Sequence, residues 1–261
     1  MIRIEHGFVI KTYPTAAQEE FEKAQALWAL SAAGAFHTPR PLSLDAKSQQ
    51  LTFEYLRGLR PITLDYVAFL REQSSESIVL ERFRLVGCAL AAIHNDLAMT
   101  HTLKWTPQAP FITELRRNHV LPVLQEGEFR PVLHCDYGFS NIFFTSHSEV
   151  PVILDASPNG YTTFSTACRG PAYIDVAHFL ACIYCLWWKA KTRRPGVTQL
   201  DRLANAYVTG YQEGSGQVLS HRLLTGTSRA IGRSYLKSRF RGSLLPWVAD
   251  KALYSRTRHC R

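Results

Sequence analysis

The feature that most constrains this chain is a polar loop at residues 134–141, His-Cys-Asp-Tyr-Gly-Phe-Ser-Asn, enclosed by apolar segments. One apolar run enters the loop at residues 131–133, and a second leaves it at residues 142–144. A third apolar run, residues 152–154, ends at Asp155. Short apolar runs separated by polar turns are typical of strands, so the pattern predicts short strands around a loop that displays polar groups.

The loop carries Asp136 and Asn141 five residues apart, and a hairpin return would bring Asp155 close to both. These groups suit phosphoryl transfer, because a carboxylate can orient a hydroxyl while an amide oxygen and a second carboxylate hold Mg²⁺ against phosphates. The alternative is a hairpin with ordinary solvated loop residues. The joint spacing, with apolar strands on both sides, favours the catalytic interpretation.

The motif His-x-Asp-x-x-x-x-Asn at residues 134–141, followed by Ile-Leu-Asp at residues 153–155, resembles the catalytic core of the aminoglycoside phosphotransferase-like kinases. This family includes choline kinase-like proteins and belongs to the protein kinase-like superfamily. The resemblance implies an α+β, two-lobe fold with a small N-terminal β-sheet lobe and a larger, mainly helical C-terminal lobe. A chain of 261 residues suits one such unit, with lobes at residues 1–57 and 58–261.

The same resemblance implies a role for each polar residue of the loop. Asp136 would be the catalytic base, and His134 would brace the loop from behind. Asn141 and Asp155 would hold Mg²⁺ against ATP. The sequence departs from the family at Cys135, where the family usually has Gly.

The N-terminal segment predicts two strands, residues 2–5 and 8–13, joined at a His-Gly turn. Its Phe-Val-Ile-Lys resembles the third strand of a kinase N-lobe, which implies that Lys11 contacts the α- and β-phosphates of ATP. Only ten residues precede Lys11, and no Gly-rich loop is among them. We therefore expect a truncated small lobe.

A helix is expected over residues 15–33, with Thr15 as its cap. The resemblance implies that a glutamate of this helix pairs with the strand lysine, and we expect that residue to be Glu22. Glu19 and Glu20 remain alternatives. When this helix is aligned with the corresponding helix of the family, the position of the family's glutamate falls nearer Lys23.

Residues 39–44 and 51–56 predict a hairpin, and residues 54–58, at the end of its second strand, resemble the kinase hinge. The backbone near Glu54, Tyr55 and Leu56 would pair with adenine. Farther along, residues 170–180 resemble the family's Gly-Asp-Pro-x-x-Asp-Leu-Ala, although the first Asp is missing.

That second match implies that Asp175 holds the backbone of the catalytic loop from the first turn of a buried helix. Other helices of the large lobe are expected over four segments, and apolar periodicity supports the second of them. In the second of them, His94 is expected to be a core or capping residue. These segments are residues 61–72, 77–95, 111–125 and 198–213. Residues 156–169 occupy the activation-loop position.

The net charge of +9 is concentrated at the C-terminus, where residues 221–261 carry ten Lys or Arg and one acid. Helices are expected at residues 218–241 and 244–256, and the first carries four basic residues at spacings that allow one shared face. These residues are Arg222, Arg229, Arg233 and Lys237. A cationic aminoglycoside needs an acidic surface, so we expect a neutral or anionic sugar, sugar phosphate or glycan as acceptor.

Two further hypotheses remain open. The chain could be a pseudokinase or binding module, or residues 221–261 could bind an anionic partner or membrane surface. Nucleic acid is the least favoured partner, because no recognised motif or aromatic stacking pattern is present. Six scattered cysteines and the polar N-terminus suggest a cytoplasmic protein, which the basic segment could hold at a membrane surface, and a homodimer stays open.

Overall fold

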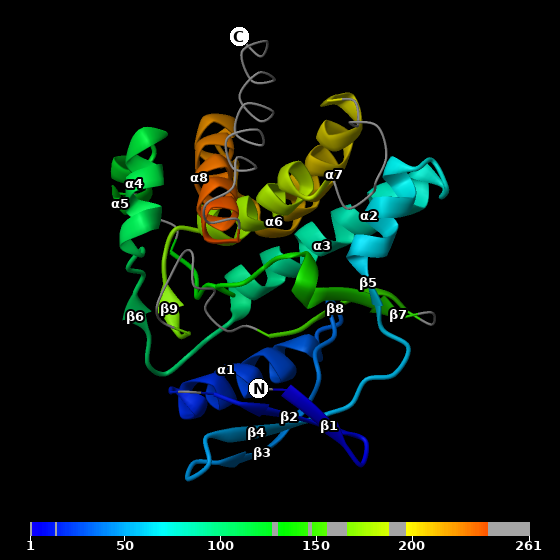
Figure 1. The fold of residues 1–261 in the computed structure, drawn as a ribbon, viewed down its shortest axis with the longest axis vertical. Helices are drawn as coiled ribbons and strands as arrows, with labels where there is room; N and C mark the ends of the chain where they lie inside the picture. The colour runs from blue at the N-terminus through cyan, green and yellow to red at the C-terminus, as the bar shows by residue number, and fades with distance from the viewer. Residues whose placement is uncertain are drawn as a thin grey trace.

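The computed structural model describes residues 2–13, 15–126, 130–145, 148–155, 166–187 and 197–239. The small lobe contains a sheet and one helix, and the large lobe is mostly helical (Figure 1). This arrangement confirms the expected α+β fold with a small lobe that contains a sheet and a larger, mainly helical lobe. No helix among the described residues is both long and apolar enough to cross a bilayer.

The small lobe is a four-stranded antiparallel sheet in the order β1-β2-β4-β3. Its strands are β1 (Ile2–Glu5), β2 (Phe8–Thr12), β3 (Pro41–Asp45) and β4 (Gln50–Glu54). Strand β2 pairs with β4 from Phe8↔Glu54 to Thr12↔Gln50, so Lys11 lies opposite Leu51. The pairing places the predicted phosphate-binding lysine in the strand next to the predicted hinge.

Helix α1 (Ala17–Ser31) lies beside this sheet and faces the large lobe (Figure 1). The prediction that Thr15 caps it is wrong. The N-cap residue is Ala16, at φ 61°, and it makes no side-chain cap bond. Instead, the Ala17 N–H donates to the Gln49 side chain at 3.3 Å, because the β3–β4 turn packs against the start of the helix.

The large lobe is built from seven helices among the described residues. They are α2 (Ile62–Leu70), α3 (Glu76–Asp96), α4 (Ala109–Arg117), α5 (Leu121–Glu126), α6 (Tyr173–Cys185), α7 (Val197–Ser215) and α8 (His221–Arg239). The single helix expected at residues 111–125 is two helices, α4 and α5. The chain turns at His119, whose φ of 56° is left-handed and therefore ends α4.

Helices α3 and α7 pack backbone against backbone at the centre of the large lobe. A Cβ on Gly87 would lie 2.1 Å from the Tyr207 carbonyl oxygen, and a Cβ on Gly210 would lie 2.0 Å from that of Arg84. Only glycine allows this approach. The two helices are thereby fixed as one unit that carries His94 and Tyr211.

A three-stranded sheet, β5-β7-β8, lies between the α1 region and the large-lobe helices (Figure 1). It comprises β5 (Arg60–Pro61), β7 (Ile142–Thr145) and β8 (Ser148–Ile153). The short strands β6 (Leu103–Lys104) and β9 (Cys168–Arg169) pair in parallel on the other side of the view in Figure 1. His37 bridges β8, because its N–H donates to Pro151 and its carbonyl accepts from Ile153. This bridge ties the segment after α1 to the strand that leads to Asp155.

Candidate active site

A cavity of about 330 Å³ lies at the junction of the two lobes. Lys11 of β2 and Glu20 of α1 line it from the small lobe, and Asn141 and Asp155 line it from the large lobe. The predicted hinge, residues 54–56, also lines it. The cavity is therefore the place where the predicted nucleotide-binding groups of both lobes meet.

Lys11 and Asp155 form an ion pair in this cavity. Burial alone would lower the pKa of Lys11, but the Asp155 carboxylate and Tyr13 raise it above its ordinary value, so the ammonium stays charged. The Lys11 Nζ also lies 5.1 Å from the centroid of the Tyr13 ring. Asp155 has φ 48°, a left-handed conformation that Asp tolerates better than most residues.

The prediction that Glu22 pairs with Lys11 is wrong. Glu22 is exposed and accepts a hydrogen bond from the Gln18 amide at 2.7 Å. Because successive helix residues are rotated by about 100°, Glu22 points away from the face that carries Glu20. Of the three acids that the sequence left open, Glu20 is the one that is buried and lines the cavity with Lys11.

The loop at residues 134–141 brings Asp136 and Asn141 into contact. The Asn141 amide donates to the backbone carbonyl of Asp136 at 2.9 Å and to its carboxylate at 2.8 Å. The short 3-10 helix η1 (Phe139–Asn141) closes the loop, and the Leu154 N–H donates to the Asn141 carbonyl. The expected hairpin return therefore places Asp155 beside the loop.

His134 lies beneath the loop, fully buried. Its Nδ1 accepts the Asp136 N–H at 3.3 Å, and its ring contacts that of Tyr137 edge to face. Burial lowers the pKa of His134 to about 3, so the ring is neutral and able to accept this hydrogen bond. A neutral ring that accepts the Asp136 N–H from beneath the loop has the position that the predicted bracing role requires.

Asp175 holds the loop backbone, as expected from the second motif. Its carboxylate accepts the N–H groups of His134 at 2.6 Å and Cys135 at 2.9 Å. His94 contacts the same carboxylate at 3.1 Å and is itself bonded to the Tyr211 hydroxyl, so it is the core residue that the sequence predicted. Burial alone would raise the pKa of Asp175, but the His94 hydrogen bond and nearby positive charges lower it below its ordinary value.

The residues present fit a magnesium ion held together with a nucleotide. The Asn141 amide oxygen accepts no hydrogen bond from the described residues, and the Asp155 carboxylate already attracts the Lys11 cation. No cluster of three or more His, Cys, Asp or Glu side chains in the described part of the chain could hold a metal alone. Mg²⁺ is usually bound by one or two protein ligands and by substrate phosphates, which matches this pair.

Sequence reasoning missed three residues near the site. Tyr13 lines the cavity, His178 places Nδ1 3.7 Å from the Asp136 carboxylate, and Lys23 is fully buried beneath the loop. The only signal for Lys23 was its place in the helix, where the family register puts a glutamate. His178 follows Asp175 by three residues, so the two lie on neighbouring faces of α6.

Two of the four basic residues predicted to share a face of α8 contact an acidic side chain of the protein itself. Arg233 is buried and lies 3.4 Å from the Glu114 carboxylate of α4, and Lys237 pairs with the same group. Helix packing buries Arg233, whereas Lys237 stays exposed and reaches the same carboxylate. Spacing along one helix could not reveal either contact. Residues 156–165 of the activation-loop position and residues 240–261, including the helix expected at 244–256, lie outside the described residues.

The fold is similar to those of several solved small-molecule kinases. A glucosamine kinase in complex with glucosamine, ADP and inorganic phosphate aligns with a TM-score of 0.69 and 18% identity, over 96% of this chain and 76% of that one. A choline/ethanolamine kinase family protein from Mesorhizobium loti aligns with a TM-score of 0.58 and 12% identity, over 97% and 83%. No protein-family model matches the sequence, and no curated protein sequence does. Similarity at these identities establishes the two-lobe fold.

Proposed function

We propose that this chain, which has the two-lobe fold of protein kinase-like small-molecule kinases, is an ATP- and Mg²⁺-dependent kinase. It would transfer the γ-phosphate of ATP to a hydroxyl group of a small molecule. The observation that carries the proposal is the convergence of Lys11, Asn141 and Asp155 on one cavity, with Asp136 bonded to Asn141 at its edge. Phosphoryl transfer depends on positioning and on charge stabilisation by groups of this kind.

In this proposal each wall of the cavity has a separate task. The backbone of residues 54–56 pairs with adenine, and the apolar side chains of Val9, Leu27 and Leu154 enclose the base. The Lys11 ammonium leaves Asp155 for the phosphates, which offer more negative charge. Asn141 and Asp155 would hold Mg²⁺, which neutralises the charge that develops on the transferred phosphoryl group.

Asp136 is the group that would receive the acceptor's proton. Its side chain is about a quarter exposed, so a hydroxyl can reach it, and the Asn141 bond fixes its orientation. The acceptor oxygen forms a bond to the γ-phosphorus while the bond from that phosphorus to the β,γ-bridging oxygen breaks. The hydroxyl proton passes to the Asp136 carboxylate, and ADP leaves.

We further propose a sugar-like, neutral or anionic acceptor in preference to a cationic aminoglycoside. The positive charge of residues 221–261 supports this choice, and Glu114 offsets only part of the charge of the three basic side chains around it, Arg117, Arg233 and Lys237. The solved glucosamine kinase of similar fold binds glucosamine, which supports the sugar-like part of this choice, whereas the choice of charge rests on residues 221–261 alone. A panel of acceptors tests this choice separately from ATP use.

Replacing Asp155 with Ala is expected to weaken Mg·ATP binding by about 100-fold, or ~3 kcal/mol, because the main metal ligand and the Lys11 partner are lost together. Isothermal titration calorimetry with and without Mg²⁺ measures this. Glu22→Ala is the matched control on the exposed side of α1 and should bind like wild type. Absence of nucleotide binding by the wild type at millimolar ATP would contradict the proposal and favour a non-catalytic binding module.

A further inference from the structure

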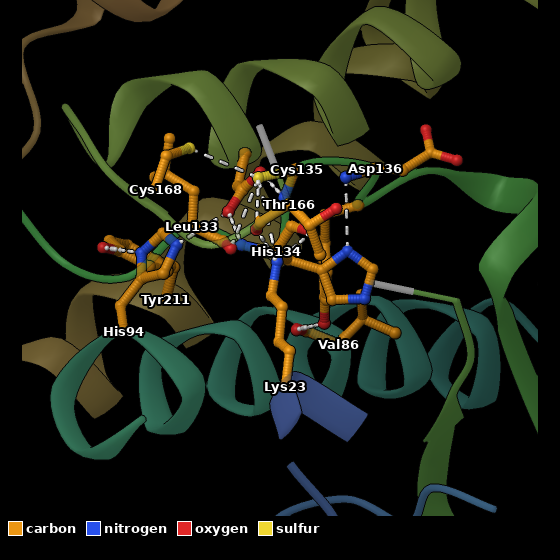
Figure 2. A network of polar contacts seen from close by, with 12 residues as sticks. Lys23, Val86, His94, Leu133, His134, Cys135, Asp136, Thr166, Cys168 and Tyr211 are labelled. Carbon is orange, nitrogen blue, oxygen red and sulfur yellow. Dashed lines mark hydrogen bonds and ion pairs between the residues drawn. The ribbon is translucent and has the colours of Figure 1, made fainter. Parts of the chain in front are cut away.

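Lys23 of α1 reaches into the catalytic loop from the small lobe. Its side chain is fully buried, and its Nζ donates to the carbonyl oxygens of His134 at 3.0 Å and Thr166 at 2.7 Å. Figure 2 shows the side chain extending from α1 toward Cys135 and Thr166. Lysine is almost never fully buried in proteins, because its ammonium group loses strong hydration, so such a residue calls for a specific role.

The ammonium acts on one particular peptide group. The unit between His134 and Cys135 has its carbonyl bonded to Lys23 and its N–H bonded to Asp175. The buried Lys23 ammonium and the buried Asp175 carboxylate therefore hydrogen-bond to the two polar ends of the same peptide group. This plane lies directly before Cys135, and Asp136 is the next residue.

The backbone conformation at Cys135 is unfavourable by itself and needs these two hydrogen bonds. Cys135 has φ 80°, a left-handed conformation that a residue with a Cβ rarely adopts. Rotation of the preceding peptide plane would let φ return to its usual negative range. That rotation would also move the Asp136 backbone and redirect its carboxylate.

Lys23 is joined to the nucleotide cavity through its own helix. Glu20, one turn earlier, lines the cavity and accepts a hydrogen bond from the Thr166 hydroxyl at 2.7 Å. The Lys23 ammonium donates to the backbone carbonyl of the same residue. Both side chains thus hold Thr166, which leads into β9. Helix α1 is thereby connected to the nucleotide cavity, to the β9 segment and to the catalytic loop.

We propose that Lys23 is a positioning residue for Asp136, which fixes the His134–Cys135 peptide plane and so sets the direction of the catalytic carboxylate. This inference rests on the proposed kinase function for its kinetic test. Its structural content, the fixed peptide plane, can be measured without any turnover. Lys23 needs no contact with ATP or acceptor to act in this way.

The test replaces Lys23 with Met, which keeps the length of the side chain and removes the ammonium. We expect kcat to fall on the order of 100-fold, the effect of a misplacement of about 1 Å, while KM for ATP changes little. Gln25→Met, on the exposed surface of α1, is the control and should leave both constants unchanged. If a folded Lys23→Met variant keeps the wild-type kcat, or if KM alone changes, the proposal is overturned.

A second experiment uses the unfavourable left-handed backbone conformation of Cys135. Glycine adopts a φ of +80° without a steric cost, so Lys23→Met should reduce kcat less in a Cys135→Gly background than in the wild type. Lys23 acting only through core packing would give equal effects in both backgrounds, which would contradict the proposal. If Lys23→Met does not fold, Lys23→Arg replaces it, because the larger guanidinium keeps the charge but shifts the donor atoms.

Hydrogen exchange separates this inference from the proposed function. In full-length Lys23→Met, the amide of Cys135 should exchange about tenfold faster than in the wild type, with amides of the α3 core unchanged. This result supports the inference even if the wild type transfers no phosphate. Unchanged protection at Cys135 in the folded variant overturns it even if the wild type is an active kinase.

Discussion

Replacing Asp136 with Asn is expected to lower kcat by about 10³-fold while the affinity for Mg·ATP stays within about threefold of wild type. Asparagine has nearly the same shape as Asp but cannot accept the hydroxyl proton. Asp136 lies at the edge of the cavity and contacts Asn141 without lining the nucleotide space itself, so ATP binding should persist. Steady-state kinetics at saturating acceptor, together with calorimetric titration of Mg·ATP, measure the two quantities.

Asp96→Asn is the matched control, because Asp96 is an exposed carboxylate at the end of α3. It should leave both kcat and nucleotide affinity unchanged. An Asp136→Asn variant that loses nucleotide affinity as strongly as kcat would assign Asp136 to metal or phosphate binding. A variant with wild-type kcat would remove it from the catalytic step altogether.

Replacing Asp175 with Ala is expected to lower the free energy of unfolding by about 3–5 kcal/mol. The carboxylate is fully buried and accepts two backbone N–H groups, so its loss leaves the His134 and Cys135 donors without an acceptor. The catalytic loop should also lose its shape, and kcat should fall with the stability. Urea unfolding followed by tryptophan fluorescence measures the change.

The effect of this substitution should depend on pH in a definite direction. The folded-state pKa of Asp175 lies below its ordinary value of 3.8, so its stabilising contribution is complete above about pH 5. It shrinks as the pH falls through the folded-state pKa. Glu213→Ala, which removes an exposed ion pair with Arg84, should change stability by less than about 1 kcal/mol at neutral pH. An equally small effect of Asp175→Ala would contradict the assigned role.

Local pattern predicted the parts of the fold that depend on neighbouring residues. The alternation of apolar runs and turns located β1 to β4 closely, and the motif spacing brought Asp136, Asn141 and Asp155 together. The role of Asp175 was also predicted, through the resemblance of residues 170–180 to a family motif, and its carboxylate does accept two backbone N–H groups of the loop. Each of these inferences rests on residues that are close in the chain or on a motif.

The errors share a different cause, which is that tertiary packing decides how a helix is rotated and what its polar groups meet. Glu22 was expected at the cavity, but packing places Glu20 there and buries Lys23 against the loop at residues 134–141. Arg233 and Lys237 were expected to face an external anion, but they meet Glu114 from another helix. A buried lysine such as Lys23 cannot be told from a surface lysine until its neighbours are known.

The most direct test of the central claim is transfer of labelled phosphate from ATP to an acceptor. Wild type and Asp136→Asn would be incubated with [γ-¹⁸O]ATP, with and without Mg²⁺, and with panels of neutral sugars, sugar phosphates and aminoglycosides. Mass spectrometry would detect any phosphorylated product. We expect Mg²⁺-dependent transfer by the wild type to a neutral or phosphorylated sugar and almost none by Asp136→Asn. Equal transfer by both proteins, or wild type that neither binds nor consumes ATP, would contradict the assignment of this cavity as a kinase active site.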